Sequence, residues 1–287
     1  MEKLNEILDR DMFLKRVTPT SSSEMKTKPA YKCKTCKDSG IKGDGETHYQ
    51  NIGVTGKRFC DQCEKGNKMF RDWFYLPEQQ KQHQKFKQDK IARALRLSNL
   101  SPVYLKAKLE DLKNNKALEE TCKLYLENWK KIKPLGLGYY FWGNVGAGKT
   151  YTAAILANEL MKQHFVEVLF LKMPEAVARI KKSFGSDKKD SDKNLFEKMR
   201  DAEMLILDDL GIEKVSDWLA DEIYQVVEHR YSNNLPMIIT SNQSLDDLAK
   251  IYREQVSSRI TEKTKSIKFT QKDKRQKLGE EIKQTLF

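Results

Sequence analysis

The segment Gly143–Thr150, GNVGAGKT, matches the pattern G-x-x-x-x-G-K-[ST] at every fixed position. Glycines at these spacings let several backbone N–H groups point at one phosphate, and a helix that begins at the motif adds positive potential. Lys149 is expected to reach the β- and γ-phosphates, and Thr150 to ligate Mg²⁺. The pattern predicts a site for ATP and Mg²⁺ formed by Gly143, Asn144, Val145, Gly146, Ala147, Gly148, Lys149 and Thr150.

Two later segments supply the polar residues that ATP hydrolysis needs. Asp208 and Asp209 follow an apolar run in LILDDLG, and we expect Asp208 to serve Mg²⁺ and Asp209 to orient or deprotonate the attacking water. Many related ATPases carry glutamate at the position of Asp209. Because aspartate is one methylene shorter, its carboxylate is expected to be less well placed and hydrolysis to be slow. Asn242 in IITSN is expected to hydrogen-bond the γ-phosphate or the attacking water, although a Ser-Asn pair can also simply begin a turn.

Two arginines beyond Asn242 are further candidates for the triphosphate site. Arg259 lies in YREQVSSRI and Arg275 lies in FTQKDKRQK. An arginine in such an ATPase can act on the triphosphate within its own subunit or across a subunit boundary. The alternative is that both are ordinary surface arginines of a basic tail, and spacing alone leaves both interpretations open.

Composition limits the classes of partner. The chain of 287 residues carries a net charge of +12 and has a pI near 9.2, which fits either a nucleic-acid partner or a solvated basic surface. No apolar run reaches the roughly 18 residues of a membrane span. The N-terminal sequence MEKLNEILDRDMF is too charged for a signal peptide. We therefore expect a cytoplasmic protein with reduced thiols and no membrane partner.

Four of the five cysteines form the pattern C-x₂-C-x₂₃-C-x₂-C, at Cys33, Cys36, Cys60 and Cys63. In a reduced protein, two such pairs predict a closed tetrahedral Zn²⁺ site, and its role is structural because four thiolates leave no position open for catalysis. His48 lies between the pairs and is an alternative to one of the cysteines. A redox-active dithiol is a further alternative.

The remaining sequence predicts the elements that position these residues. Buried strands are expected at YYFW, VEVLFLKM, MLILDD and PMIITSN, and helices at TAAILANELMKQHF, PEAVARIKKSF and DWLADEIYQVVEHRY. Residues 185–194 are expected to form a polar loop. Cys122 shares helical spacing with Leu118 and Tyr125 and is expected in the core. Alternating strands and helices predict an α/β fold with a mainly parallel sheet that is covered on both faces.

The domain organisation follows from shifts in composition. We expect a zinc-binding N-terminal domain at 1–75, with an amphipathic helix over residues 1–16 and a Ser/Thr/Pro-rich linker over residues 17–30. Residues 76–96 are polar and basic and are expected to form a helical tether. The ATPase domain is expected at 97–287.

Two aromatic residues stand among basic or polar ones. Phe184 follows Lys181 and Lys182, and Trp218 lies close to Lys214 and Ser216. Aromatic faces beside cations suit stacking on the bases of single-stranded DNA. Ordinary packing of both rings is the alternative.

With these motifs in place, the chain resembles the AAA+ replicative helicase loaders of the DnaC/DnaI type from bacteria and their phages. The resemblance covers roughly residues 97–278 and rests on five motifs in order, FWGNVGAGKT, LILDDLG, LPMIITSN, EQVSSRI and FTQKDKR. It implies an AAA+ P-loop ATPase domain with a Walker A motif at Gly143–Thr150, a Walker B motif at Asp208–Asp209 and sensor 1 at Asn242. It also implies that Arg259 is an arginine finger and Arg275 the sensor 2 arginine.

The resemblance further implies contacts with single-stranded DNA near Phe184, Ser216 and Trp218. Loaders of this type use their N-terminal region to grip the hexameric replicative helicase, and some carry a zinc site there. The sequence departs from the family at two points, because Asp209 replaces the glutamate of some members and a four-cysteine site is not universal among them.

Together these features predict an ATP-dependent loader that self-associates through its AAA+ domain and delivers a replicative helicase hexamer onto single-stranded DNA. ATP would act as a switch for assembly. One alternative is an ATPase partner of a transposase, of the IstB type, which shares this core. A second alternative is a zinc module that binds nucleic acid or protein and carries a vestigial ATPase.

Overall fold

A computed structural model of the chain describes residues 33, 35, 39–49, 53–183, 190–212 and 215–271. Contacts between Cα atoms divide the chain into two compact units, residues 1–89 and 90–287. The division falls within helix α3 (Pro77–Leu97), which occupies the segment predicted as a helical tether. The predicted helix at residues 1–16 and the linker at residues 17–30 lie outside the described residues.

The first unit contains an antiparallel hairpin of β1 (Ile41–Tyr49) and β2 (Val54–Phe59), followed by helix α2 (Glu64–Phe74). Aromatic side chains join the hairpin to α2: the ring centroids of Tyr49 and Phe59 lie 5.2–5.8 Å from those of Phe70 and Trp73. Such ring pairs supply much apolar contact for a segment too short to build a large core.

The second unit is built on a five-stranded sheet. Its strand order is β4-β5-β6-β3-β7, and every pairing between neighbours is parallel, as the sequence predicts. The strands are β3 (Gly138–Gly143), β4 (Val168–Lys172), β5 (Met204–Asp208), β6 (Met237–Ser241) and β7 (Thr264–Phe269). The edge strand β7 is absent from the sequence-based prediction because its outer positions are polar, TKSIKF, and give no apolar run.

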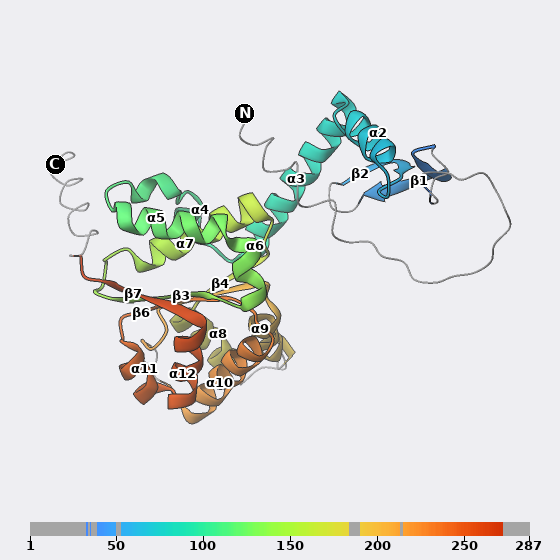
Figure 1. Cartoon of the computed structure of the whole chain (residues 1–287). Coiled ribbons are helices and arrows are strands. Elements are labelled where there is room, and N and C mark those ends of the chain that lie inside the picture. Colours follow the sequence, from blue (N-terminus) through green and yellow to red (C-terminus); the bar gives the residue numbers. More distant parts are fainter. Residues whose placement is uncertain are drawn as a thin grey trace. The chain divides into compact units, whose positions relative to one another are not determined.

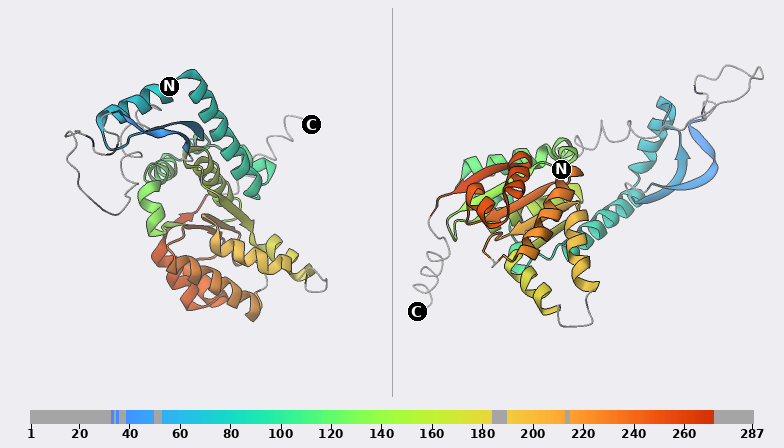
Figure 2. Two further views of the ribbon diagram at one scale, coloured as in Figure 1. Left: turned by 90° about the vertical axis from the view of Figure 1, so that its right-hand side faces the viewer. Right: turned by 90° about the horizontal axis from the view of Figure 1, so that it is seen from below.

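Helices cover both faces of this sheet (Figures 1 and 2). On one face lie α4 (Pro102–Leu105), α5 (Lys116–Glu127), α6 (Trp129–Ile132) and α7 (Lys149–His164), with short 3₁₀ turns η1 (Leu109–Leu112) and η2 (Lys133–Leu135). On the other lie α8 (Met173–Ser183), α9 (Asp190–Asp201), α10 (Asp217–Ser232), α11 (Leu245–Ile251) and α12 (Glu254–Lys263). The prediction that residues 185–194 form a loop is wrong for 190–194, which begin α9. The sequence DSDKN is polar, and such residues suit the first turn of a helix as well as a loop.

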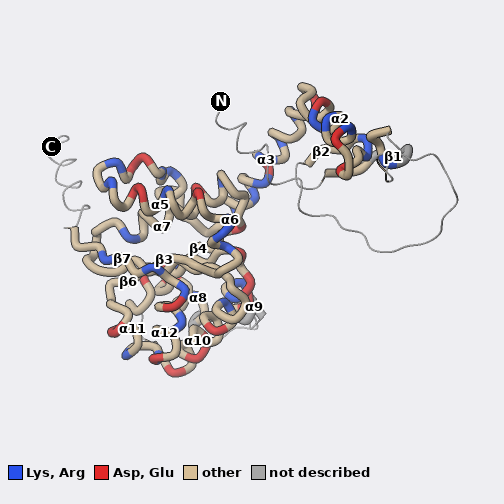
Figure 3. The backbone as a smooth tube through the Cα atoms, viewed as in Figure 1, with Lys and Arg blue, Asp and Glu red and all other residues tan. Residues whose placement is uncertain are grey.

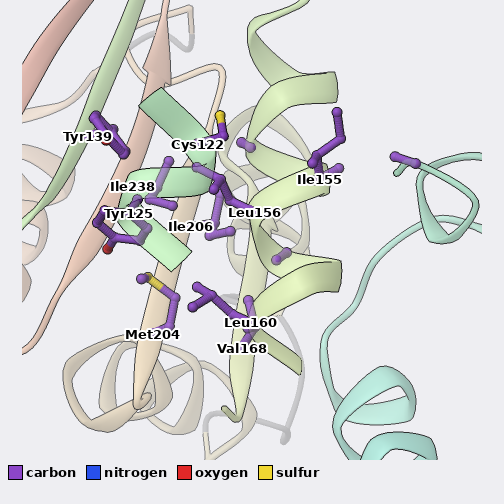
Figure 4. Packing of buried hydrophobic residues seen from close by; sticks show 14 of the residues in the cluster. Cys122, Tyr125, Tyr139, Ile155, Leu156, Leu160, Val168, Met204, Ile206 and Ile238 are labelled. Atoms are coloured by element: carbon purple, nitrogen blue, oxygen red, sulfur yellow. The ribbon is translucent and has the colours of Figure 1, made fainter. Parts of the chain in front are cut away.

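Alternate strand residues feed two separate cores, as a pleated strand requires. Tyr139 and Phe141 pack with α5 and α7, while Tyr140 between them packs with α10 and α12 on the other face. Figure 4 shows the first core, in which Cys122 is fully buried, as its spacing predicts. Charged residues lie mainly on the helices, and the inner strands carry few (Figure 3).

A buried arginine ties the covering helices to the sheet. Arg230 on α10 is inaccessible to solvent, and its guanidinium donates hydrogen bonds of 2.7–3.0 Å to the carbonyls of Met199, Arg200, Ala202 and Pro236. Three of these carbonyls lie at the end of α9, before β5, and the fourth directly precedes β6. One side chain therefore fixes the segments that lead into β5 and β6. No helix within the described ranges is long and apolar enough to cross a membrane.

Candidate functional site

The GNVGAGKT segment joins β3 to α7 and has the backbone that phosphate binding requires. Gly143 and Gly148 have φ values of +118° and +101°, which side-chain-bearing residues rarely adopt. A Cβ atom at Gly143 would lie 2.3 Å from the Phe269 carbonyl oxygen, whereas one at Gly148 would meet nothing within 4 Å. The loop is therefore packed tightly on β7 at one end and open at the N-terminus of the 16-residue helix α7, where an anion is favoured.

Lys149 brings two sequence motifs together. Its side chain is buried, and its ammonium donates hydrogen bonds to the Gly143 and Asn144 carbonyls and to Oδ1 of Asn242, at 2.8, 2.7 and 2.8 Å. Asn242 directly follows β6, the strand beside β3. The predicted phosphate-binding lysine and the predicted γ-phosphate sensor thus lie in direct contact, although they are 93 positions apart in the sequence.

Asp208 ends β5 and is fully buried. The Thr240 hydroxyl donates a 2.7 Å hydrogen bond to Oδ1 of this carboxylate, while Oδ2 is buried without a hydrogen-bond partner among the described residues. Burial raises the pKa of Asp208 to about 6, against the opposing effect of the Thr240 hydrogen bond. The charge of Asp209 adds to the rise, and the Thr150 hydroxyl and the Lys172 ammonium lower the pKa. An unpartnered carboxylate oxygen close to a threonine hydroxyl is a donor set that Mg²⁺ prefers, so these residues fit that ion.

Asp209 has a left-handed backbone, with φ of +59°, and its N–H donates to the Thr240 hydroxyl oxygen at 2.9 Å. Thr240 therefore contacts both aspartates. This residue is absent from the sequence-based prediction, although the apolar strand MIITS ends in two hydroxyl residues, Thr240 and Ser241, directly before Asn242, and this was an available signal.

Lys172 is a second residue that the sequence analysis did not identify. It ends β4 and pairs in register with Asp208 on β5. Its ammonium lies 3.3 Å from Glu175, and this hydrogen bond, followed by the charges of Asp209 and Asp208, raises the pKa of Lys172. The Lys172 ammonium therefore lies near Asp208 and Asp209. The sequence does not indicate this, because it depends on the pairing of β4 with β5.

Arg259 lies on α12, and its described partners all belong to α10 and α12. It forms an ion pair with Glu228 and donates a 3.1 Å hydrogen bond to the Gln255 carbonyl. Among the described residues, the structure does not bring it to the phosphate-binding loop. Arg275 lies outside the described residues.

The three predicted DNA-contacting residues have different settings. Ser216 accepts a hydrogen bond from the Leu219 N–H at 3.3 Å and caps α10. Trp218, in the first turn of α10, packs edge-on against Phe196 with centroids 5.7 Å apart, yet it keeps 39% of its surface exposed. Phe184 lies outside the described residues.

Three of the four predicted zinc ligands converge in the first unit. The Sγ atoms of Cys33, Cys60 and Cys63 all lie within 4.8 Å of one another, and those of Cys33 and Cys60 are 3.7 Å apart. Cys63 caps α2 and accepts a hydrogen bond from the Gly66 N–H at 3.4 Å. Cys36 lies outside the described residues, as does the side chain of His48. Three convergent thiols fit Zn²⁺, which prefers sulfur ligands.

Residues 79–263 match a family model described as IstB-like ATP binding protein. The chain belongs to this family. The match covers β3, β4, β5 and β6 of the five-stranded sheet and ends just before β7, and it includes the phosphate-binding loop, both aspartates and Asn242.

Individual relatives are similar over the same region. The replicative helicase loader DnaI of Bacillus subtilis is 36% identical over 117 residues, which are 39% of this chain and 35% of DnaI. The replicative helicase loader DnaC of Escherichia coli K12 is 25% identical over 122 residues, or 42% of this chain and 49% of DnaC. The chain thus matches less than two thirds of the length of either relative.

Among solved structures, a crystal structure of DnaI aligns with a TM-score of 0.51 and 27% identity, over 62% of this chain and 95% of the other. These matches confirm the predicted AAA+ fold and the resemblance to DnaC/DnaI loaders. They also agree with the predicted ATPase class.

We expect Lys149→Ala to abolish tight ATP binding, because the substitution removes the cation that is predicted to face the β- and γ-phosphates. Equilibrium titration with a fluorescent ATP analogue measures this loss. Lys162→Ala is the matched control, since Lys162 lies on the same helix but pairs with Glu159. Equal affinities for the two variants would contradict the assigned site.

We expect Asp208→Asn to stabilise the metal-free protein at pH 8, on the order of 1–2 kcal/mol, because it removes a buried charge. The raised pKa of Asp208 means that the folded state binds more protons than the unfolded state between about pH 4 and 6. Wild-type stability therefore rises as pH falls through 6, and the difference between wild type and variant shrinks. Chemical denaturation at pH 8 and pH 5 measures both effects, and an unstabilised variant at pH 8 would contradict them.

Proposed function

We propose that this protein is an ATP-dependent loader that delivers a hexameric replicative helicase onto single-stranded DNA. The contact of Lys149 with Asn242, beside the buried Asp208, carries the nucleotide part of the proposal. The similarity to DnaI and DnaC, both named replicative helicase loaders, supports the loading role.

At the nucleotide site, the backbone from Gly143 to Thr150 would cradle the phosphates and Lys149 would neutralise them. Asp208 and Thr150 would hold Mg²⁺, which when bound neutralises charge that develops on the phosphates. Asp209 would accept a proton from the attacking water, and Asn242 would orient that water. Because Lys149 binds Asn242 in this structure, arrival of the γ-phosphate would separate them, and the strand end after β6 would respond to the nucleotide.

The nucleotide would act as a switch for assembly. Arg259 and Arg275 would contact the triphosphate, Arg259 from a neighbouring subunit, so that ATP links subunits and hydrolysis separates them.

Single-stranded DNA would bind the ATPase domain through Phe184, Ser216 and Trp218. The exposed part of Trp218 and the net charge of +12 support that interface.

The N-terminal domain, residues 1–75, would grip the helicase. A Zn²⁺ ion held by Cys33, Cys36, Cys60 and Cys63 would stiffen it, and a preformed surface binds with less ordering cost than a flexible one.

For zinc, we expect about one Zn²⁺ per chain in freshly purified protein and its loss in Cys60→Ser, because a four-thiolate site does not tolerate loss of a ligand. Metal analysis by mass spectrometry measures both. Cys122→Ser is the matched control, since Cys122 is buried in the hydrophobic core of the second unit and does not belong to the thiol cluster. Full zinc content in Cys60→Ser would contradict the site.

An IstB-type partner of a transposase is the second candidate, and the family match to IstB-like ATP binding proteins favours it. The two candidates differ in the protein that binds the N-terminal domain.

Helicase loading is tested with the full chain and the replicative helicase of the source cell, by following unwinding of a forked DNA with ATP. We expect unwinding to require the chain and to fail when Leu4, Ile7 and Leu8 are changed to Asp, because buried unpaired charges are costly at an apolar interface. Leu124→Asp is the control, since this leucine of α5 is already 53% exposed. Unchanged unwinding in the triple variant, together with recovery of a transposase from the cell extract, would favour the second candidate.

A further inference from the structure

Arg259 is held on the surface of its own subunit by a set of contacts that sequence analysis does not anticipate. Its guanidinium lies over two tyrosine rings of α10, with the Cζ atom 5.3 Å from the Tyr224 centroid and 5.7 Å from that of Tyr231. The same group forms an ion pair with Glu228, which lies between these tyrosines in the sequence. Only 24% of the Arg259 side chain is exposed.

The holding site is itself fixed in place. Tyr224, Glu228 and Tyr231 are spaced by four and three residues, so they share one face of α10. Glu228 accepts a 3.1 Å hydrogen bond from the Ser232 hydroxyl, and the Tyr231 hydroxyl donates a 2.8 Å hydrogen bond to Glu262 on α12. Tyr224 packs against the hydrophobic core of this face of the sheet. The carboxylate and both rings therefore have partners other than the arginine.

This arrangement opposes an interaction of Arg259 with a triphosphate. A carboxylate paired with the guanidinium cancels most of its charge at a distance, and the same carboxylate repels an approaching phosphate. Cation–π contacts with the two rings further stabilise the stored position. A γ-phosphate that takes the place of the carboxylate at the guanidinium must break the ion pair between Arg259 and Glu228.

We infer that Glu228, with Tyr224 and Tyr231, is a latch that retains Arg259 and thereby sets the concentration at which subunits assemble on ATP. This inference rests on the proposed function, in which Arg259 contacts the nucleotide of a neighbouring subunit. Glu228 is a positioning residue because it acts only through Arg259. Its ion pair with Arg259 breaks when the arginine binds the nucleotide of the neighbouring subunit.

A second ion pair between the same helices provides a matched control. Arg253, at the start of α12, pairs with Asp221 on α10, and its side chain is 45% exposed. Asp221→Asn removes one carboxylate from the contact of α10 with α12, as Glu228→Gln does, but leaves Arg259 and its partners in place.

The test measures assembly of the full chain with ATP and Mg²⁺ by analytical ultracentrifugation over a range of protein concentrations. Glu228→Gln is expected to lower the concentration of half-maximal assembly roughly threefold, the value of a partly exposed ion pair. The turnover number per assembled subunit should not fall. Tyr224→Leu should shift assembly in the same direction, and Asp221→Asn should not shift it. Melting temperatures without nucleotide show that each variant is folded.

Arg259→Ala and the double variant with Glu228→Gln separate the two hypotheses. If Arg259→Ala assembles as the wild type does, the arginine does not act across the interface, and the proposed role of Arg259 fails. If Arg259→Ala fails to assemble but folded Glu228→Gln requires more protein or turns over more slowly, Glu228 presents the arginine to the phosphate, and the latch is overturned. The double variant should behave as Arg259→Ala alone, because the latch acts only through that side chain.

Discussion

The second unit is organised around an ionisable carboxylate that is buried at the end of a central strand. Transfer of a charge into a protein interior costs several kcal/mol unless other groups offset it. For Asp208 the Thr240 hydroxyl donates a hydrogen bond to Oδ1 and the nearby Thr150 hydroxyl also favours the charged form, but Oδ2 has no hydrogen-bond partner among the described residues. A cation bound at Oδ2 would offset this cost. The raised pKa of Asp208 reflects the burial of its carboxylate.

Parallel strand order is what concentrates the remaining chemistry at this point. All five strands end at one edge of the sheet, and β6 lies between β3 and β5. The residues that follow β3, end β5 and follow β6 are therefore neighbours, although more than ninety positions separate Lys149 from Asn242. The core on each face of the sheet fixes the strands that carry these groups. The Arg230 contacts do the same at the segments that lead into β5 and β6.

Much of this was predictable, for identifiable physical reasons. The loop at Gly143–Thr150, Asp208 and Asn242 each follow an apolar run, so these runs and the motifs after them predicted that the residues lie at strand ends. Thr240 and Lys172 were missed because their importance depends on which strands are neighbours, and no local pattern encodes that order. Strand β7 was missed because an edge strand with a polar outer face lacks the apolar run of a buried one. The contacts of Arg259 with Tyr224 and Glu228 join two helices, and spacing within one helix could not reveal them.

The hydroxyl of Thr240 has a single proton, and that proton determines the direction of the hydrogen bonds around it. The Asp209 N–H donates a hydrogen bond to the Thr240 oxygen, and the Thr240 hydroxyl donates one to Oδ1 of Asp208. The backbone of one aspartate and the side chain of the other are thus consecutive links of a polarised chain, in which each bond strengthens the next. The chain runs in this direction only while Oδ1 of Asp208 accepts. A proton on that oxygen would reverse the last link and leave the threonine with two donors and no acceptor. The geometry of the backbone at Asp209 is therefore coupled, through one rotatable O–H bond, to the charge state of its neighbour.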